Sequence, residues 1–172
     1  PVSGEGAQAF TRAQVEEPFL NAARQGDAAL LTRFRAAGMD PNLRAEKGYT
    51  PLILATYNCH AQAAAVLLAH GAQADLQDEK GASALAGVAF KGDVALARQL
   101  LDAGASVDVP NAVGRTPLMF AVMFGREPMV RLLLGAGASP TLRDWEGLSA
   151  VDLAQRQGNT ALAQDIRHAA HG

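Results

Sequence analysis

The stretch GRTPLMFAVMFGREPMVRLLLGAGASPTLRD, residues Gly114 to Asp144, decides the fold because a similar sequence occurs earlier in the chain. The earlier version is GYTPLILATYNCHAQAAAVLLAHGAQADLQD, and it begins at Gly48. The two stretches share their opening, an apolar segment, a glycine-rich turn and a closing aspartate. Repetition on this scale indicates a repeat architecture, which has to be tested before any local structure is assigned.

Three sets of residues recur at one period, and this period defines the units. The first set consists of glycines 33 residues apart: Gly48, Gly81, Gly114 and Gly147. The second set keeps the same step: Gly38, Gly71, Gly104 and Gly137. The third set does so with Cys59 in the slot of the missing glycine: Gly26, Cys59, Gly92, Gly125 and Gly158. Three independent ladders with one period predict a stack of equivalent units.

Each unit carries the local chemistry of two short helices. A hydroxyl residue stands two positions after the opening glycine, where it can cap a helix start: Thr50, Ser83, Thr116 and Ser149. Pro51 and Pro117 follow at the first helical position, which tolerates a missing N–H, and Pro18 has the same phase one unit earlier. The next ladder glycine can end this helix in a left-handed conformation. We therefore expect first helices near 17–25, 50–58, 83–91, 116–124 and 149–157, each followed by a second helix.

The pattern resembles the ankyrin repeat, a β-turn plus two helices in 33 residues, over residues 15 to 168. The resemblance implies an all-α solenoid with an N-terminal arm at 1–14 and a repeat domain at 15–172. We expect five units: 15–45 as the N-terminal cap, 46–78, 79–111, 112–144, and 145–172 as the polar C-terminal cap.

The chain departs from the family pattern in one slot. Family units read T-P-L-H, with the histidine tying neighbouring turns, whereas this slot holds Ile53, Ala86, Met119 and Asp152. We therefore expect fewer hydrogen bonds between units and more apolar contact. The third unit should be the softest, because Gly87 inside its first helix costs about 1 kcal/mol relative to alanine.

Composition and residue spacing argue against several function classes. The net charge of −2 predicts no attraction to nucleic acid, and the apolar runs are too short for membrane insertion. The single cysteine, Cys59, excludes an internal disulfide and a cysteine-based zinc site. Cys59 and His60 are adjacent, and we interpret Cys59 as a small residue at a turn rather than as a nucleophile. Asp40, Asp75 and Asp108 recur at similar phase and are interpreted as turn residues. We expect no catalytic residues, metal or cofactor.

The resemblance implies that the concave face and its projecting turns bind another protein. The expected contact residues are Tyr49, Tyr57, Lys80, Phe90, Arg115, Met123, Phe124 and Trp145, which include five of the nine aromatic residues. Aromatic residues and arginine are common binding hot spots. We expect Tyr49 and Trp145 to be exposed, while packing between units is the alternative for Phe90 and Phe124. Acidic residues border this strip and favour a partner with a basic rim: Glu46, Asp78, Glu79, Asp144 and Glu146.

A second reading of the function remains open at this stage. The chain begins at Pro1 rather than Met, so it is expected to have lost preceding residues. The alternative is therefore an ankyrin segment of a larger multidomain or exported protein. Rare lysine and abundant arginine and alanine hint at a bacterial source. We expect a soluble monomer, cytoplasmic by default, or periplasmic if a signal peptide preceded Pro1.

Overall fold

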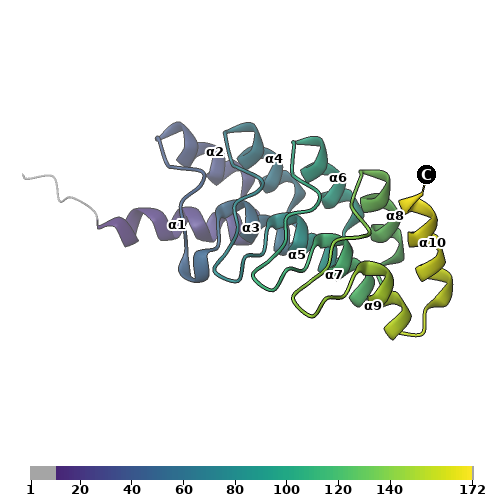
Figure 1. Cartoon of the computed structure of the whole chain (residues 1–172). Coiled ribbons are helices and arrows are strands. Elements are labelled where there is room, and N and C mark those ends of the chain that lie inside the picture. Colours follow the sequence, from purple (N-terminus) through teal and green to yellow (C-terminus); the bar gives the residue numbers. More distant parts are fainter. Residues whose placement is uncertain (1–10, 172) are drawn as a thin grey trace, which may run out of the picture.

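The computed structural model describes residues 11–171, and in this part of the chain ten α-helices form five consecutive pairs (Figure 1). The pairs are α1 (Arg12–Gln25) with α2 (Ala28–Ala36), α3 (Pro51–Tyr57) with α4 (Ala61–Ala69), α5 (Ala84–Lys91) with α6 (Val94–Asp102), α7 (Pro117–Met123) with α8 (Glu127–Gly135), and α9 (Ala150–Arg156) with α10 (Thr160–Ala170). A short 3₁₀ turn, η1 (Glu46–Gly48), precedes α3. The expected all-helical solenoid is confirmed.

The helices stack in two rows (Figure 1). Each first helix packs against the next first helix and against its own second helix. Two ladders of fully buried side chains, each with the 33-residue step, fill the space between the rows. One ladder is Phe19, Leu52, Leu85 and Leu118, and the other is Leu67, Leu100, Leu133 and Ile166. The period of the sequence is therefore the period of the core.

The helix ends form as the residue types predict. The four hydroxyl residues of the ladder accept hydrogen bonds from the backbone N–H three positions on, at 3.1–3.4 Å: Thr50, Ser83, Thr116 and Ser149. Gly26 and Gly92 end their helices in the left-handed region. Cys59 takes the same conformation with φ 62°, which confirms it as the stand-in for a ladder glycine.

Helix α1 differs from the expectation. It begins at Arg12 rather than near residue 17, and Pro18 lies inside it instead of at its first position. A capping box explains the early start, because Gln14 N–H donates to the Thr11 hydroxyl at 3.3 Å and Thr11 N–H donates to Gln14 Oε1 at 2.8 Å. Most of the expected arm, residues 1–10, lies outside the described residues.

The loops before α3, α5, α7 and α9 form finger-like turns that project along one edge of the stack (Figure 1). One backbone bond joins each finger tip to the tip before it: Glu79 N to Lys47 O at 2.9 Å, Ala112 N to Lys80 O at 3.0 Å, and Trp145 N to Val113 O at 3.0 Å. The fingers are so close that a Cβ on Gly81 would lie 2.6 Å from the Ala112 nitrogen. The opening glycines therefore let neighbouring fingers touch.

Side chains outside the missing histidine slot provide further hydrogen bonds between units. Gln77 donates to Pro110 O at 2.8 Å, and Arg44 donates to Gln77 O in the same way one unit earlier. Asp75 accepts from the N–H and the hydroxyl of Ser106 at 2.8 and 2.6 Å. Asp75 lies in a turn, as expected, and its carboxylate also ties two units together.

Candidate functional site

The eight expected contact residues belong to the finger turns and to the C-terminal ends of the first helices, which together form a surface that we call the finger face. Four of them are exposed: Tyr57, Lys80, Phe124 and Trp145. The other four are half-buried: Tyr49, Phe90, Arg115 and Met123. Only half of the expected contact residues are therefore fully accessible.

Trp145 is the most exposed large apolar residue of the described chain, with 78 % of its surface accessible. Its backbone is nevertheless fixed, because its N–H donates to Val113 O at 3.0 Å. Its ring lies beside Gly114, where an added Cβ would meet Trp145 Cδ1 at 3.2 Å. Trp145 is thus a large aromatic side chain presented from a rigid turn, and its expected exposure is confirmed.

Phe90 and Phe124 come from neighbouring units and contact each other edge to face. Their ring centroids are 4.5 Å apart, with an angle of 76° between the ring planes. Phe90 is half-buried by this arrangement, while Phe124 remains 46 % exposed. Both alternatives therefore apply in part: the two rings pack against each other between units, and the Phe124 ring also remains exposed at the surface.

Tyr49 differs from the expectation of exposure at a turn tip. It is half-buried and packs against the hydrophobic core. Its carbonyl accepts a hydrogen bond from Ala45 N at 2.8 Å across the base of the finger. The turn places Tyr49 at the finger base and not at the tip, so its side chain faces the helices.

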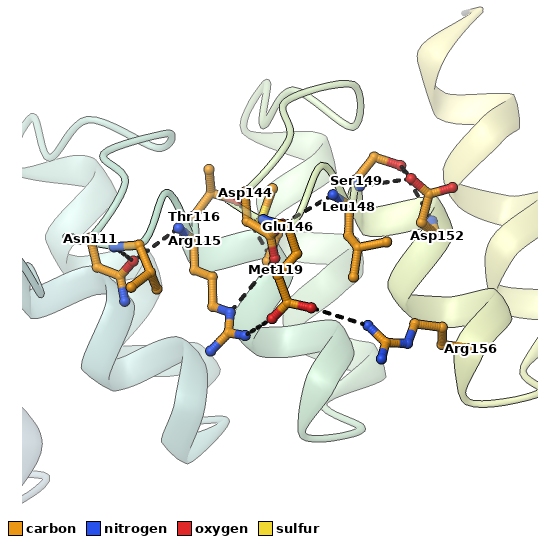
Figure 2. Close-up of polar contacts among 11 residues, drawn as sticks. Asn111, Arg115, Thr116, Met119, Asp144, Glu146, Leu148, Ser149, Asp152 and Arg156 are labelled. Atoms are coloured by element: carbon orange, nitrogen blue, oxygen red, sulfur yellow. Dashed lines mark hydrogen bonds and ion pairs between the residues drawn. The ribbon is translucent and has the colours of Figure 1, made fainter.

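Two acidic residues expected at the rim are instead part of a charge network (Figure 2). The Asp144 carboxylate is buried, with Oδ1 accepting from Glu146 N at 2.9 Å and Leu148 N at 3.0 Å. Arg115 Nε lies 3.7 Å from Asp144 Oδ2, and Arg115 Nη2 lies 3.3 Å from Glu146 Oε1. Glu146 also pairs with Arg156 at 3.5 Å. Asp144 is therefore buried and does not lie at the exposed border as expected, whereas Glu146 is exposed there and pairs with two arginines.

Asp152, in the slot of the family histidine, closes the start of α9. Its Oδ2 accepts from Ser149 N at 2.9 Å and from the Ser149 hydroxyl at 3.0 Å (Figure 2). Arg143 Nη1 adds an ion pair at 3.0 Å. The hydrogen bonds from Ser149, assisted by the Arg143 charge, hold the pKa of the Asp152 carboxyl below its ordinary value.

A cavity of about 250 Å³ between the second and third units was not foreseen. Tyr49, Ile53 and Tyr57 line it from the second unit, and Ala84 and Gly87 line it from the third. The sequence signal for this cavity is the smallness of the residues in the third unit, which by itself predicts a weak helix and not an opening.

Two further observations concern residues 11–171 as a whole. These residues contain no group of three or more His, Cys, Asp or Glu side chains that could hold a metal ion. No helix among them combines the length and apolarity needed to span a bilayer.

Stacked helix pairs on a 33-residue period, with finger turns along one edge, define a helical repeat protein. The family described as "Ankyrin repeats (3 copies)" matches residues 19–111, 63–144 and 86–168, so the matches together cover most of the chain. The chain belongs to the ankyrin repeat family. Repeats of this family are generally protein-interaction modules. No curated protein matches the chain.

Proposed function

We propose that this chain is a non-catalytic protein-binding module, a scaffold, adaptor or inhibitor, whose partner protein contacts the finger face. The observation that carries the proposal is Trp145, which is 78 % exposed although its backbone is hydrogen-bonded into the stack. Trp, Tyr and Arg are the residues most often found as hot spots. The proposed contact residues are Tyr49, Tyr57, Lys80, Phe90, Arg115, Met123, Phe124 and Trp145.

The rigidity of these side chains supports the proposal energetically. Phe124 is held by its edge contact with Phe90, and Arg115 is held by Asp144 and Glu146. Binding through side chains that are already ordered loses little conformational entropy, so more of the contact energy is available as affinity. Arg115 would thus act as a fixed donor with Glu146 beside it, not as a free cation.

The charges of the finger face favour a partner with both signs of charge at its rim. Lys80 and Glu79 are exposed side by side at one finger tip, and Lys47 and Glu46 repeat this pair at the tip before it. The buried Asp144 contributes no free negative charge. A partner with an apolar centre and a mixed rim fits this surface better than a purely basic one.

An affinity experiment with matched variants tests the proposal. The purified chain captures its partner, and the Kd is then measured for Trp145→Ala, for Tyr57→Ala, and for two changes on the opposite side of the stack, Arg98→Ala and Arg131→Ala. If Trp145 and Tyr57 are hot spots, each change should weaken binding by about 2 kcal/mol or more, roughly 30-fold, with the thermal midpoint nearly unchanged. If the arginine variants lose binding while the aromatic variants bind normally, the interface lies on the opposite side of the stack and the proposal is wrong.

A further inference from the structure

We propose that the cavity between the second and third units binds one large apolar side chain, of phenylalanine or leucine type, from the partner polypeptide. The inference rests on the proposed function and names the chemistry of the contact. The cavity lies where the Tyr49 finger, α3 and α5 meet. Its volume of about 250 Å³ is below the range of about 300–1,000 Å³ typical of small-molecule sites, so it suits an anchoring side chain better.

The cavity exists because of Gly87. The equivalent positions in the other four units, at steps of 33 residues, hold Asn21, Leu54, Phe120 and Leu153, all of which carry larger side chains. Where those units fill the space beside the first helix, the third unit leaves it open. The hollow is therefore a departure of one unit from the pattern of its own neighbours.

Nothing in the local structure requires glycine at position 87. Gly87 lies inside α5 and is not among the residues with positive φ. A Cβ added there would meet only Tyr57 Cδ2, at 3.4 Å, which is ordinary van der Waals contact. Glycine inside a helix lowers stability relative to alanine. The residue thus weakens the helix without a packing reason, and its effect is to keep the cavity open.

Four of the polar side chains that line the cavity are already hydrogen-bonded within the chain. Thr56 and Asn58 donate to carbonyls of α3 at 2.9 and 2.8 Å. The Ser83 hydroxyl accepts from the first turn of α5 at 3.2 Å, and Asp78 Oδ1 accepts two finger N–H groups at 2.9 Å. These four side chains offer a polar occupant few hydrogen bonds in return for its lost hydration, so an apolar occupant is favoured.

Charges of both signs lie at the cavity, because Lys91 lies over the Tyr57 ring and the Asp78 carboxylate is one of the lining groups. Lys91 Nζ lies 4.4 Å from the centroid of the Tyr57 ring, so the ring already interacts with a cation. A second ammonium or guanidinium group at the Tyr57 ring would be repelled by Lys91. The same charge favours a partner segment that carries a carboxylate next to its apolar anchor.

An NMR titration of the isotopically labelled full chain tests the site directly. The probe is N-acetyl-L-phenylalanine methylamide, with N-acetyl-L-lysine methylamide as the cationic comparison. We expect saturable shifts of the Tyr57, Ala84 and Gly87 amides with the phenylalanine probe and none with the lysine probe. The absence of saturable shifts at these amides, or equal shifts with both probes, would overturn the inference.

Two variants and one control connect the binding to the cavity. Gly87→Leu, which copies the second and fifth units, should remove the saturable shifts, and Gly87→Ala should weaken the binding. Gly135→Ala is the matched control, because Gly135 is also helical and an added Cβ there meets nothing within 4 Å. Both alanine variants should raise the thermal midpoint, but only Gly87→Ala should weaken probe binding. Unchanged probe binding by Gly87→Leu would refute the site. If the phenylalanine probe does not bind while partner binding still depends on Trp145, the cavity is not the anchoring site, and the proposed function is retained.

Discussion

Replacing Leu133 by alanine should lower the free energy of unfolding by about 2–5 kcal/mol. Leu133 is fully buried in α8, which packs against α6, α7 and α10. Losing its three extra carbons removes about 2–2.5 kcal/mol of transfer energy at about 0.8 kcal/mol per group. Because helices pack on it from both neighbouring units, the site cannot collapse fully, and a cavity term adds to the loss.

Urea unfolding followed by circular dichroism measures this change. With a slope of about 2 kcal/mol per M, the midpoint should fall by about 1–2.5 M. Leu142→Ala is the matched control, because Leu142 is 41 % exposed and its truncation should change the midpoint little. Equal effects of the two substitutions would refute the packing argument.

Hydrogen exchange by mass spectrometry then tests where the damage lies. In a linear stack, coupling runs only between adjacent units, so exchange should accelerate most in the third, fourth and fifth units. Uniform acceleration from α1 to α10 would show that the described chain unfolds as one cooperative block, against this localisation.

Three further predictions follow from the local geometry. Asp152→Asn should lower the thermal midpoint at neutral pH. Because the pKa of the Asp152 carboxyl is lowered in the folded state, its stabilisation is present above about pH 3.9 and is lost as the pH falls through the lowered pKa. The difference in thermal midpoint between the Asp152→Asn variant and the original protein should therefore disappear in acid. Cys59→Gly should raise the free energy of unfolding by about 0.5–1 kcal/mol in urea titrations, since φ 62° strains a side-chain-bearing residue; a loss would reveal an unrecognised contact of the thiol. A double-mutant cycle of Phe90→Leu and Phe124→Leu should give a coupling free energy of about 0.5–1.5 kcal/mol. Additive effects of the two substitutions would show that the ring contact does not contribute to stability.

The periodic features of the fold could be predicted because each depends on one residue type at a fixed offset. Thr50 and Thr116 cap their helices because a hydroxyl two positions after glycine faces the free N–H groups of the first turn. The start of α1 was missed because the first unit lacks the opening glycine. In that unit a capping box between Thr11 and Gln14, which lies before the repeat pattern, starts the helix instead.

The candidate site was only partly predictable because its contacts join different units. Sequence spacing places Arg115, Asp144 and Glu146 near finger tips, but it does not show which side chains turn inward and pair. The cavity depends on the absence of a side chain at Gly87 and on walls supplied by the preceding unit. A single repeat, considered alone, does not contain either feature.

Hydrogen-exchange footprinting of the complex with the captured partner tests the central claim most directly. The account predicts added protection at the fingers around Lys80, Arg115 and Trp145 and at the C-terminal ends of α3, α5 and α7. Protection confined to the second helices α4, α6 and α8, with the finger tips unchanged, would contradict it.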